Sequence, residues 1–130
     1  MFSAQCTNGG YANQFLSFHS FLVNIGNDFD LSSGTFTTPI TGIYELSLFG
    51  SIDHKSTFDS VNMKIMKNNE EVFSILNYVD SSDSDDFISG STWLLPLHKG
   101  DKVRIYISKG NIACGVDFPG IFNGKYLGPM

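Results

Sequence analysis

Apolar residues alternate with other residues along several short stretches of the chain. Tyr44–Leu48 carries Tyr and Leu at every second position, and Val103–Ser108 carries Val and Ile in the same way. A period of two puts alternate side chains on opposite faces of a strand, so each stretch predicts a β-strand with one buried face. No window sustains the 3.6-residue apolar period of a helix, and turn-forming residues interrupt the chain at short intervals. The pattern predicts an all-β protein.

Other parts of the chain fit the same interpretation. Asn68-Asn69 lies between Val61–Lys67 and Glu71–Val79, which predicts a hairpin because Asn tolerates the left-handed backbone of a tight turn. Further strands are predicted at Phe2–Cys6, Phe15–Val23, Gly34–Thr37, Ile88–Leu97 and Ile121–Leu127. Pro39 and Pro96 are expected on edge strands or at strand ends, since proline cannot donate to a ladder. The count is about eight to ten antiparallel strands, in a sandwich or a jelly roll.

Length and composition indicate one folded domain over residues 1–130. The apolar fraction is 42%, which excludes a disordered chain. The net charge is −5 with eight basic residues, and this argues against nucleic-acid binding. No apolar run approaches the roughly 20 residues that span a bilayer, so no membrane insertion is expected. No secretory signal is visible at the start of the sequence.

The two cysteines, Cys6 and Cys114, match neither a redox pair nor a zinc pattern. They allow two interpretations. One is a disulfide that closes about 109 residues and stabilises the domain by a few kcal/mol. The other is a pair of buried free thiols.

A longer motif lies in the N-terminal half of the chain. From residue 18 it reads FHSFLVNIGNDFDLSSGTFTTPITGIYELSL. Its landmarks, in order, are Phe18, Asn24, Phe29, Phe36, Gly42 and Tyr44. Their spacing resembles the central signature of the complement C1q domain family, with Leu46 and Leu48 at positions that are usually aromatic. Weaker similarities at Leu95–Val103 and Phe122–Leu127 extend the resemblance over most of the chain.

This resemblance implies a jelly-roll sandwich of about ten antiparallel strands, like that of tumour necrosis factor. It also implies a tight homotrimer assembled through one face of the sandwich. Within the motif, Pro39–Gly42 is expected to form the turn that leads into Tyr44, with Gly42 at a positive φ.

An acidic segment follows the predicted hairpin. It contains Asp80, Asp83, Asp85 and Asp86, and oxygen-rich loops of this kind suit calcium. The segment is not an EF-hand, because the required Gly and Glu are absent. The resemblance adds that several C1q-type trimers hold calcium with Asp side chains from this loop. The alternative is a solvated acidic loop that keeps the protein soluble.

No residues form a recognisable catalytic site, and we expect the protein not to be an enzyme. His19, His54 and His98 have no metal-ligand spacing, and they are read as structural or surface residues. No nucleophile elbow or phosphate-binding loop occurs. Trp93, Tyr78 and Tyr106 allow two interpretations, a sugar-stacking surface or the commoner role of core or subunit contacts.

The resemblance therefore favours a secreted, trimeric recognition module of innate-immune, lectin-like type. Its partners would be further copies of itself and an extracellular carbohydrate, microbial-surface or protein ligand. The alternatives are a receptor-clustering ligand of cytokine, adipokine or synaptic-organiser type, or a component of the extracellular matrix. An extracellular location is implied by the resemblance alone.

Overall fold

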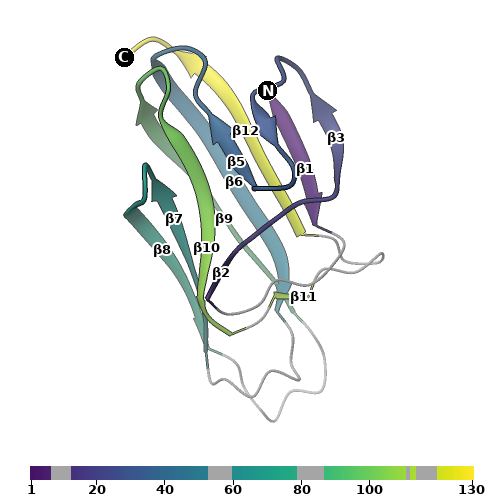
Figure 1. The fold of residues 1–130 in the computed structure, drawn as a ribbon. Helices are drawn as coiled ribbons and strands as arrows, with labels where there is room; N and C mark the ends of the chain where they lie inside the picture. The colour runs from purple at the N-terminus through teal and green to yellow at the C-terminus, as the bar shows by residue number, and fades with distance from the viewer. Residues whose placement is uncertain (7–12, 53–59, 79–86, 111, 114–119) are drawn as a thin grey trace.

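The chain folds into two β-sheets that face each other (Figure 1). The computed structural model describes residues 1–6, 13–52, 60–78, 87–110, 112–113 and 120–130. The first sheet contains β1 (Phe2–Cys6), β3 (Ser20–Asn24), β6 (Gly42–Ile52), β9 (Phe87–Leu97), β11 (Ile112–Ala113) and β12 (Gly120–Gly128). The second contains β2 (Gln14–Phe15), β4 (Phe29–Asp30), β5 (Thr35–Thr37), β7 (Ser60–Lys67), β8 (Glu70–Tyr78) and β10 (Lys102–Lys109). The all-β prediction is confirmed. In the parts of the chain just given, no helix is long and apolar enough to cross a membrane.

Each sheet is organised around one long strand. In the first sheet β6 pairs along its whole length with β9 and, on its other side, with β12 and β11. In the second sheet β10 pairs with β7 on one side and with β5 and β2 on the other. The alternating apolar residues of 44–48 and 103–107 point inward from these two strands and are at most 2% exposed. Pro96 is the penultimate residue of β9, as predicted for a proline at a strand end.

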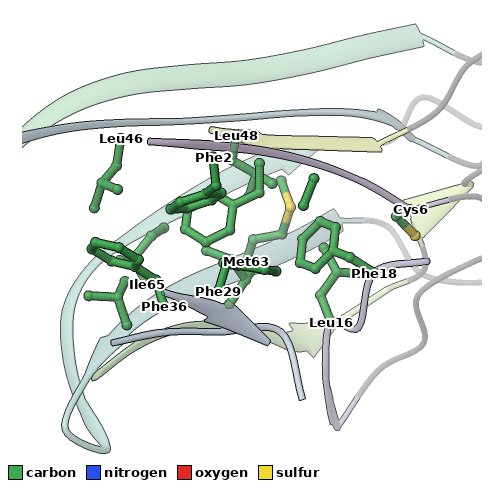
Figure 2. Packing of buried hydrophobic residues seen from close by; sticks show 14 of the residues in the cluster. Phe2, Cys6, Leu16, Phe18, Phe29, Phe36, Leu46, Leu48, Met63 and Ile65 are labelled. Carbon is green, nitrogen blue, oxygen red and sulfur yellow. The ribbon is translucent and has the colours of Figure 1, made fainter. Parts of the chain in front are cut away.

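Phenylalanine rings from several strands fill the space between the sheets. Phe2 of β1 stacks on Phe29 of β4 with ring centroids 4.5 Å apart, and it lies 5.1 Å from Phe36 of β5. Phe122 of β12 meets Phe2 edge-on at 5.2 Å. Figure 2 shows Phe2, Phe29 and Phe36 gathered between the two layers. Four strands therefore meet in one core; β1, β5 and β12 were predicted, and β4 was not. The packing agrees with a role for these Phe residues in supplying core volume.

The prediction of one strand over Phe15–Val23 is wrong. The structure has a two-residue strand, β2, in the second sheet and a separate strand, β3, in the first. Between them Leu16 and Phe18 are both buried as the chain crosses from one sheet to the other. The crossing is held by backbone bonds, including one of 2.8 Å from Leu16 N to the Ile105 carbonyl. Two apolar residues two positions apart, such as Leu16 and Phe18, have the sequence pattern of a strand. Here both are buried because the chain passes between the two sheets.

The predicted hairpin is confirmed. β7 and β8 pair in antiparallel register, and Asn68 and Asn69 adopt left-handed φ values of 51° and 67° at its tip. The final predicted residue, Val79, lies outside the described residues.

The expectation of a positive φ at Gly42 is wrong, since this residue is absent from the positive-φ glycines of the described chain. The requirement for glycine is steric instead. A Cβ at Gly42 would lie 2.4 Å from the Tyr126 ring and 2.5 Å from the Gly128 carbonyl oxygen. The close approach of β12 to the start of β6 therefore excludes a side chain here.

Cys6 is fully buried at the end of β1 and takes part in a disulfide. The other cysteine of the sequence, Cys114, lies outside the described residues. The pairing of Cys6 with Cys114 stays a prediction.

Candidate functional site

The predicted calcium ligands Asp80, Asp83, Asp85 and Asp86 lie outside the described residues, so calcium binding stays a prediction. Elsewhere, within the residues that the structure describes, no three His, Cys, Asp or Glu side chains cluster in a way that would hold a metal ion. His19 precedes β3 and His98 follows β9, and the two lie on different segments of the fold. His54 is outside the described residues.

Trp93 and Tyr106, two of the aromatic residues named for sugar stacking, lie on different sheets and do not form a shared surface. Trp93 of β9 is half-buried, packs against the core and meets Phe73 of β8 edge-on at 4.6 Å. Tyr106 of β10 packs edge-on against Phe15 at 5.1 Å. The side chain of Tyr78 is outside the described residues. Trp93 is therefore a core contact and not part of a sugar-stacking surface.

The outer face of the second sheet carries a cavity of about 570 Å³. We call it the β10 groove, because Lys102 and Arg104 of β10 lie among its lining residues. The rest come from β4, β5, the loop between them and the β7–β8 hairpin. The lining residues are Asp30, Ser33, Thr35, Thr37, Met66, Asn68, Asn69, Lys102 and Arg104. The volume falls within the roughly 300–1,000 Å³ of small-molecule sites.

Arg104 is held in a defined position beside the groove. Its guanidinium carbon lies 3.5 Å from the centroid of the Phe15 ring. Strand β2 brings Phe15 there by pairing it with Tyr106 of β10. The Arg104 Nε donates a 3.3 Å hydrogen bond to the Ser33 carbonyl oxygen. Stacking on an aromatic face and a bond at Nε leave the terminal nitrogens of the guanidinium as donors.

The loop that supplies the Ser33 carbonyl is organised by Asp30. Its two carboxylate oxygens accept hydrogen bonds of 2.7 Å from the Ser33 hydroxyl and 3.2 Å from the Ser32 hydroxyl. These bonds, the one from Ser33 above all, lower the pKa of Asp30 below its ordinary value. Asp30 therefore stays ionised at neutral pH on the wall of the groove.

The far end of the groove is fixed by contacts between the hairpin tip and the start of β10. The Asn68 amide donates a 2.9 Å bond to Asp101 Oδ1, and its oxygen accepts a 2.9 Å bond from Lys102 N. Asp101 Oδ2 accepts a 2.8 Å bond from His98 N. Asn68 is thus committed to the fold, while Asn69 beside it is exposed.

The groove has more positive than negative charge. Lys102 and Arg104 contribute two cations and Asp30 contributes one carboxylate. The ion pair seen in the described parts of the chain joins Lys64 to Glu71 at 3.7 Å and lies outside the groove. Sequence reasoning missed this site. The available signal was two basic residues at the outward positions of β10.

The outer face of the first sheet has a different character. Phe49 of β6 is 41% exposed and Leu94 of β9 is 62% exposed, although both strands bury their inward side chains. The Phe49 ring lies over Gly90, where a Cβ would be 2.1 Å from it. Gly90 and Phe49 are cross-strand partners, so the missing side chain leaves room for the ring on the sheet. This face therefore presents apolar surface to its surroundings.

Comparison with known proteins agrees with the fold. The family model of the C1q domain matches residues 1–127. The mouse complement C1q tumor necrosis factor-related protein 3 is 34% identical over 98 residues, which are 75% of this chain and 38% of that protein. The chain thus spans well under half the length of this relative.

Two solved structures share the architecture. The globular domain of zebrafish complement 1qA superposes with a TM-score of 0.75 at 20% identity, covering 99% of this chain and 98% of that one. The Eiger tumour necrosis factor of S. frugiperda gives 0.74 at 12% identity, covering 99% and 94%. The predicted tumour necrosis factor-like jelly roll is confirmed. Since the family model spans nearly the whole sequence, the chain belongs to the C1q domain family.

Proposed function

We propose that this chain is a secreted, homotrimeric recognition module that binds carbohydrate, microbial-surface or protein ligands, and that its trimer forms through the outer face of the first sheet. The observation that carries the proposal is the exposure of Phe49 and Leu94 on that face. The two side chains lie on the same face of the sheet, four residues apart in register, and exposed apolar surface is commonly covered by another protein. Membership of the C1q family makes two further copies of this chain the favoured occupants.

Two observations support a secreted location. One is family membership. The other is the disulfide at Cys6, because disulfides persist in oxidising environments such as the extracellular space.

A trimer built in this way would present its ligand sites in three copies. The β10 groove is on the second sheet, and burial of the first sheet would leave it open. Three identical sites engaging one surface raise the apparent affinity without any new contact. Such multivalency suits recognition of repetitive ligands such as glycans.

The assembly is tested by measuring the native mass by sedimentation and mass spectrometry. We expect wild-type protein at three times the 14.3 kDa of one chain. Phe49→Glu should shift the population to monomer, because a charge in an apolar interface is costly to desolvate. Leu76→Glu is the matched control, since Leu76 is a 50% exposed apolar residue on β8 of the other sheet. A monomeric wild-type chain would contradict the trimer. Absence of binding on glycan and microbial-surface arrays would contradict the recognition role.

A further inference from the structure

We propose that the β10 groove is a binding site for a carboxylate-bearing sugar, a hexuronic acid residue, with the carboxylate at Arg104 and Lys102 and the sugar hydroxyls at the polar side chains that flank β10 on either side. The inference rests on the proposed recognition function, for which it names a ligand class and a site. Its basis is the set of side chains that the fold brings into one cavity of about 570 Å³.

The basic wall matches a carboxylate. Arg104 is pre-positioned by the Phe15 ring and the Ser33 carbonyl, so little side-chain entropy is lost when a ligand binds. Its terminal nitrogens form a planar fork that suits the two oxygens of a carboxylate. Lys102, exposed two residues earlier on the same strand, adds a second positive charge. No carboxylate of the described residues forms an ion pair with either cation.

The side chains that flank β10 match hydroxyl groups. Asp30 and Thr37 lie on its β5 side, and Asn69 lies at the tip of the β7–β8 hairpin on its other side. The Asp30 carboxylate keeps acceptor capacity beyond the two serine bonds. Thr37 and Asn69 are exposed at the groove and offer both donors and acceptors. Half-buried Met66, the cross-strand partner of Arg104, provides an apolar area beside it. A sugar ring carries hydroxyls at its rim and C–H groups on its faces, and this arrangement meets both kinds of surface.

The charge count selects an acid sugar over a neutral one. The charged residues that line the groove are two cations and one carboxylate, an excess of one positive charge in a chain with net charge −5, and the Asp101 carboxylate at the far end is engaged by Asn68 and the His98 amide. One ligand carboxylate neutralises that excess. A bare carboxylate would leave Asp30 and Thr37 without a ligand partner, whereas a neutral sugar would offer Arg104 and Lys102 only uncharged acceptors.

The test uses three probes and the folded wild-type protein. Methyl β-D-glucuronide and methyl β-D-glucoside differ only in the carboxylate at C6, and acetate is the carboxylate without the sugar. Titrations followed by ¹H–¹⁵N NMR should give saturable shifts for the glucuronide at the amides of residues 37, 69, 102 and 104. We expect both the glucoside and acetate to bind at least about tenfold more weakly than the glucuronide. The glucoside lacks the charged hydrogen-bonding partner, and acetate lacks the hydroxyl contacts.

Variants localise the binding. Arg104→Gln should weaken glucuronide binding about tenfold or more, and Thr37→Val should weaken it while leaving acetate binding unchanged. Lys64→Gln is the matched control, because Lys64 is a basic residue on β7 of the same sheet but outside the groove. Should Arg104→Gln fail to fold, Lys102→Gln removes an exposed charge from the same wall and is expected to weaken binding several-fold.

Equal binding of glucuronide and glucoside, equal binding of glucuronide and acetate, or unchanged binding in the groove variants would each overturn the proposal. The same titration on Phe49→Glu separates this inference from the trimer. Glucuronide shifts that persist in a monomer support the groove even if the assembly proposal fails. A trimer without glucuronide shifts contradicts the groove alone.

Discussion

The Tyr44 hydroxyl donates a 2.6 Å hydrogen bond to the Ile40 carbonyl oxygen and accepts one of 3.3 Å from the Ile40 amide. One side chain thus satisfies both backbone groups of a residue in the turn before β6. Tyr44 is only 2% exposed and packs edge-on against Phe36 at 5.5 Å. The turn is therefore tied directly to the aromatic core, which gives a physical reason for a Tyr two residues after Gly42.

Tyr44→Phe should keep the ring packing and lose both bonds. The Ile40 carbonyl would then lack its phenolic donor, and we expect the free energy of unfolding to fall by about 1–3 kcal/mol. Chemical denaturation at neutral pH measures this. A loss within experimental error would contradict a structural role for the hydroxyl.

The same tyrosine predicts a pH dependence at the alkaline end. Burial raises the pKa of Tyr44 above its ordinary value of 10.0. The unfolded chain therefore ionises first, so the stabilisation is complete below pH 10 and is lost as pH rises toward the folded-state pKa. Denaturation midpoints between pH 9 and 11 should fall more steeply for wild type than for Tyr44→Phe. Parallel curves would show that another group controls alkaline unfolding.

Asp101 is expected to make the stability of the fold depend on pH at the acid end of the range. The hydrogen bond from the His98 amide, aided by that from Asn68, lowers the pKa of Asp101 below 3.8. The resulting stabilisation is present above the unfolded value and is lost as pH falls through the folded-state pKa. Asp101→Asn should cost about 1 kcal/mol at pH 7, a modest loss because the residue is solvent-accessible. The difference from wild type should shrink below pH 3, and a constant difference would contradict the role of the charge.

The sequence pattern predicted the long strands well, because their alternation records a buried face directly. It failed at residues 16–19, where Leu16 and Phe18 are buried for a different reason. It also identified Gly42 as a required glycine but assigned the wrong cause, since the close approach of Tyr126 depends on a contact 84 residues away. The β10 groove was missed for the same reason. Phe15, Ser33 and Arg104 meet only when β2, β10 and the loop between β4 and β5 are assembled.

Calcium binding by the acidic segment is tested by thermal unfolding. If Asp83 and Asp85 ligate the ion, calcium should raise the melting temperature and a chelator should reverse the rise. At a calcium concentration 100 times Kd, the gain in stability is about 2.7 kcal/mol. Combining Asp83→Ala with Asp85→Ala should abolish the response. A melting temperature that changes with neither calcium nor chelator would favour the alternative of a solvated acidic loop that binds no calcium.

Two positive-φ glycines provide a matched pair of substitutions. Gly34 has φ +67° and Gly100 has φ +92°, so alanine is strained at both. At Gly100 a Cβ would meet nothing within 4 Å, and Gly100→Ala should cost only the backbone strain of about 1–2 kcal/mol.

At Gly34 a Cβ would lie 2.0 Å from the Leu16 carbonyl oxygen, a backbone atom fixed by the crossing segment. Gly34→Ala should therefore destabilise by more than the strain alone, to about 3 kcal/mol or above. Because the neighbouring Ser33 carbonyl accepts the bond from Arg104 Nε, the same change should disturb that side chain. Chemical denaturation of both variants, with the Arg104 Nε–H resonance as a local probe, tests the argument. Equal losses for the two substitutions would mean that backbone strain governs both sites and that the approach of Leu16 does not matter.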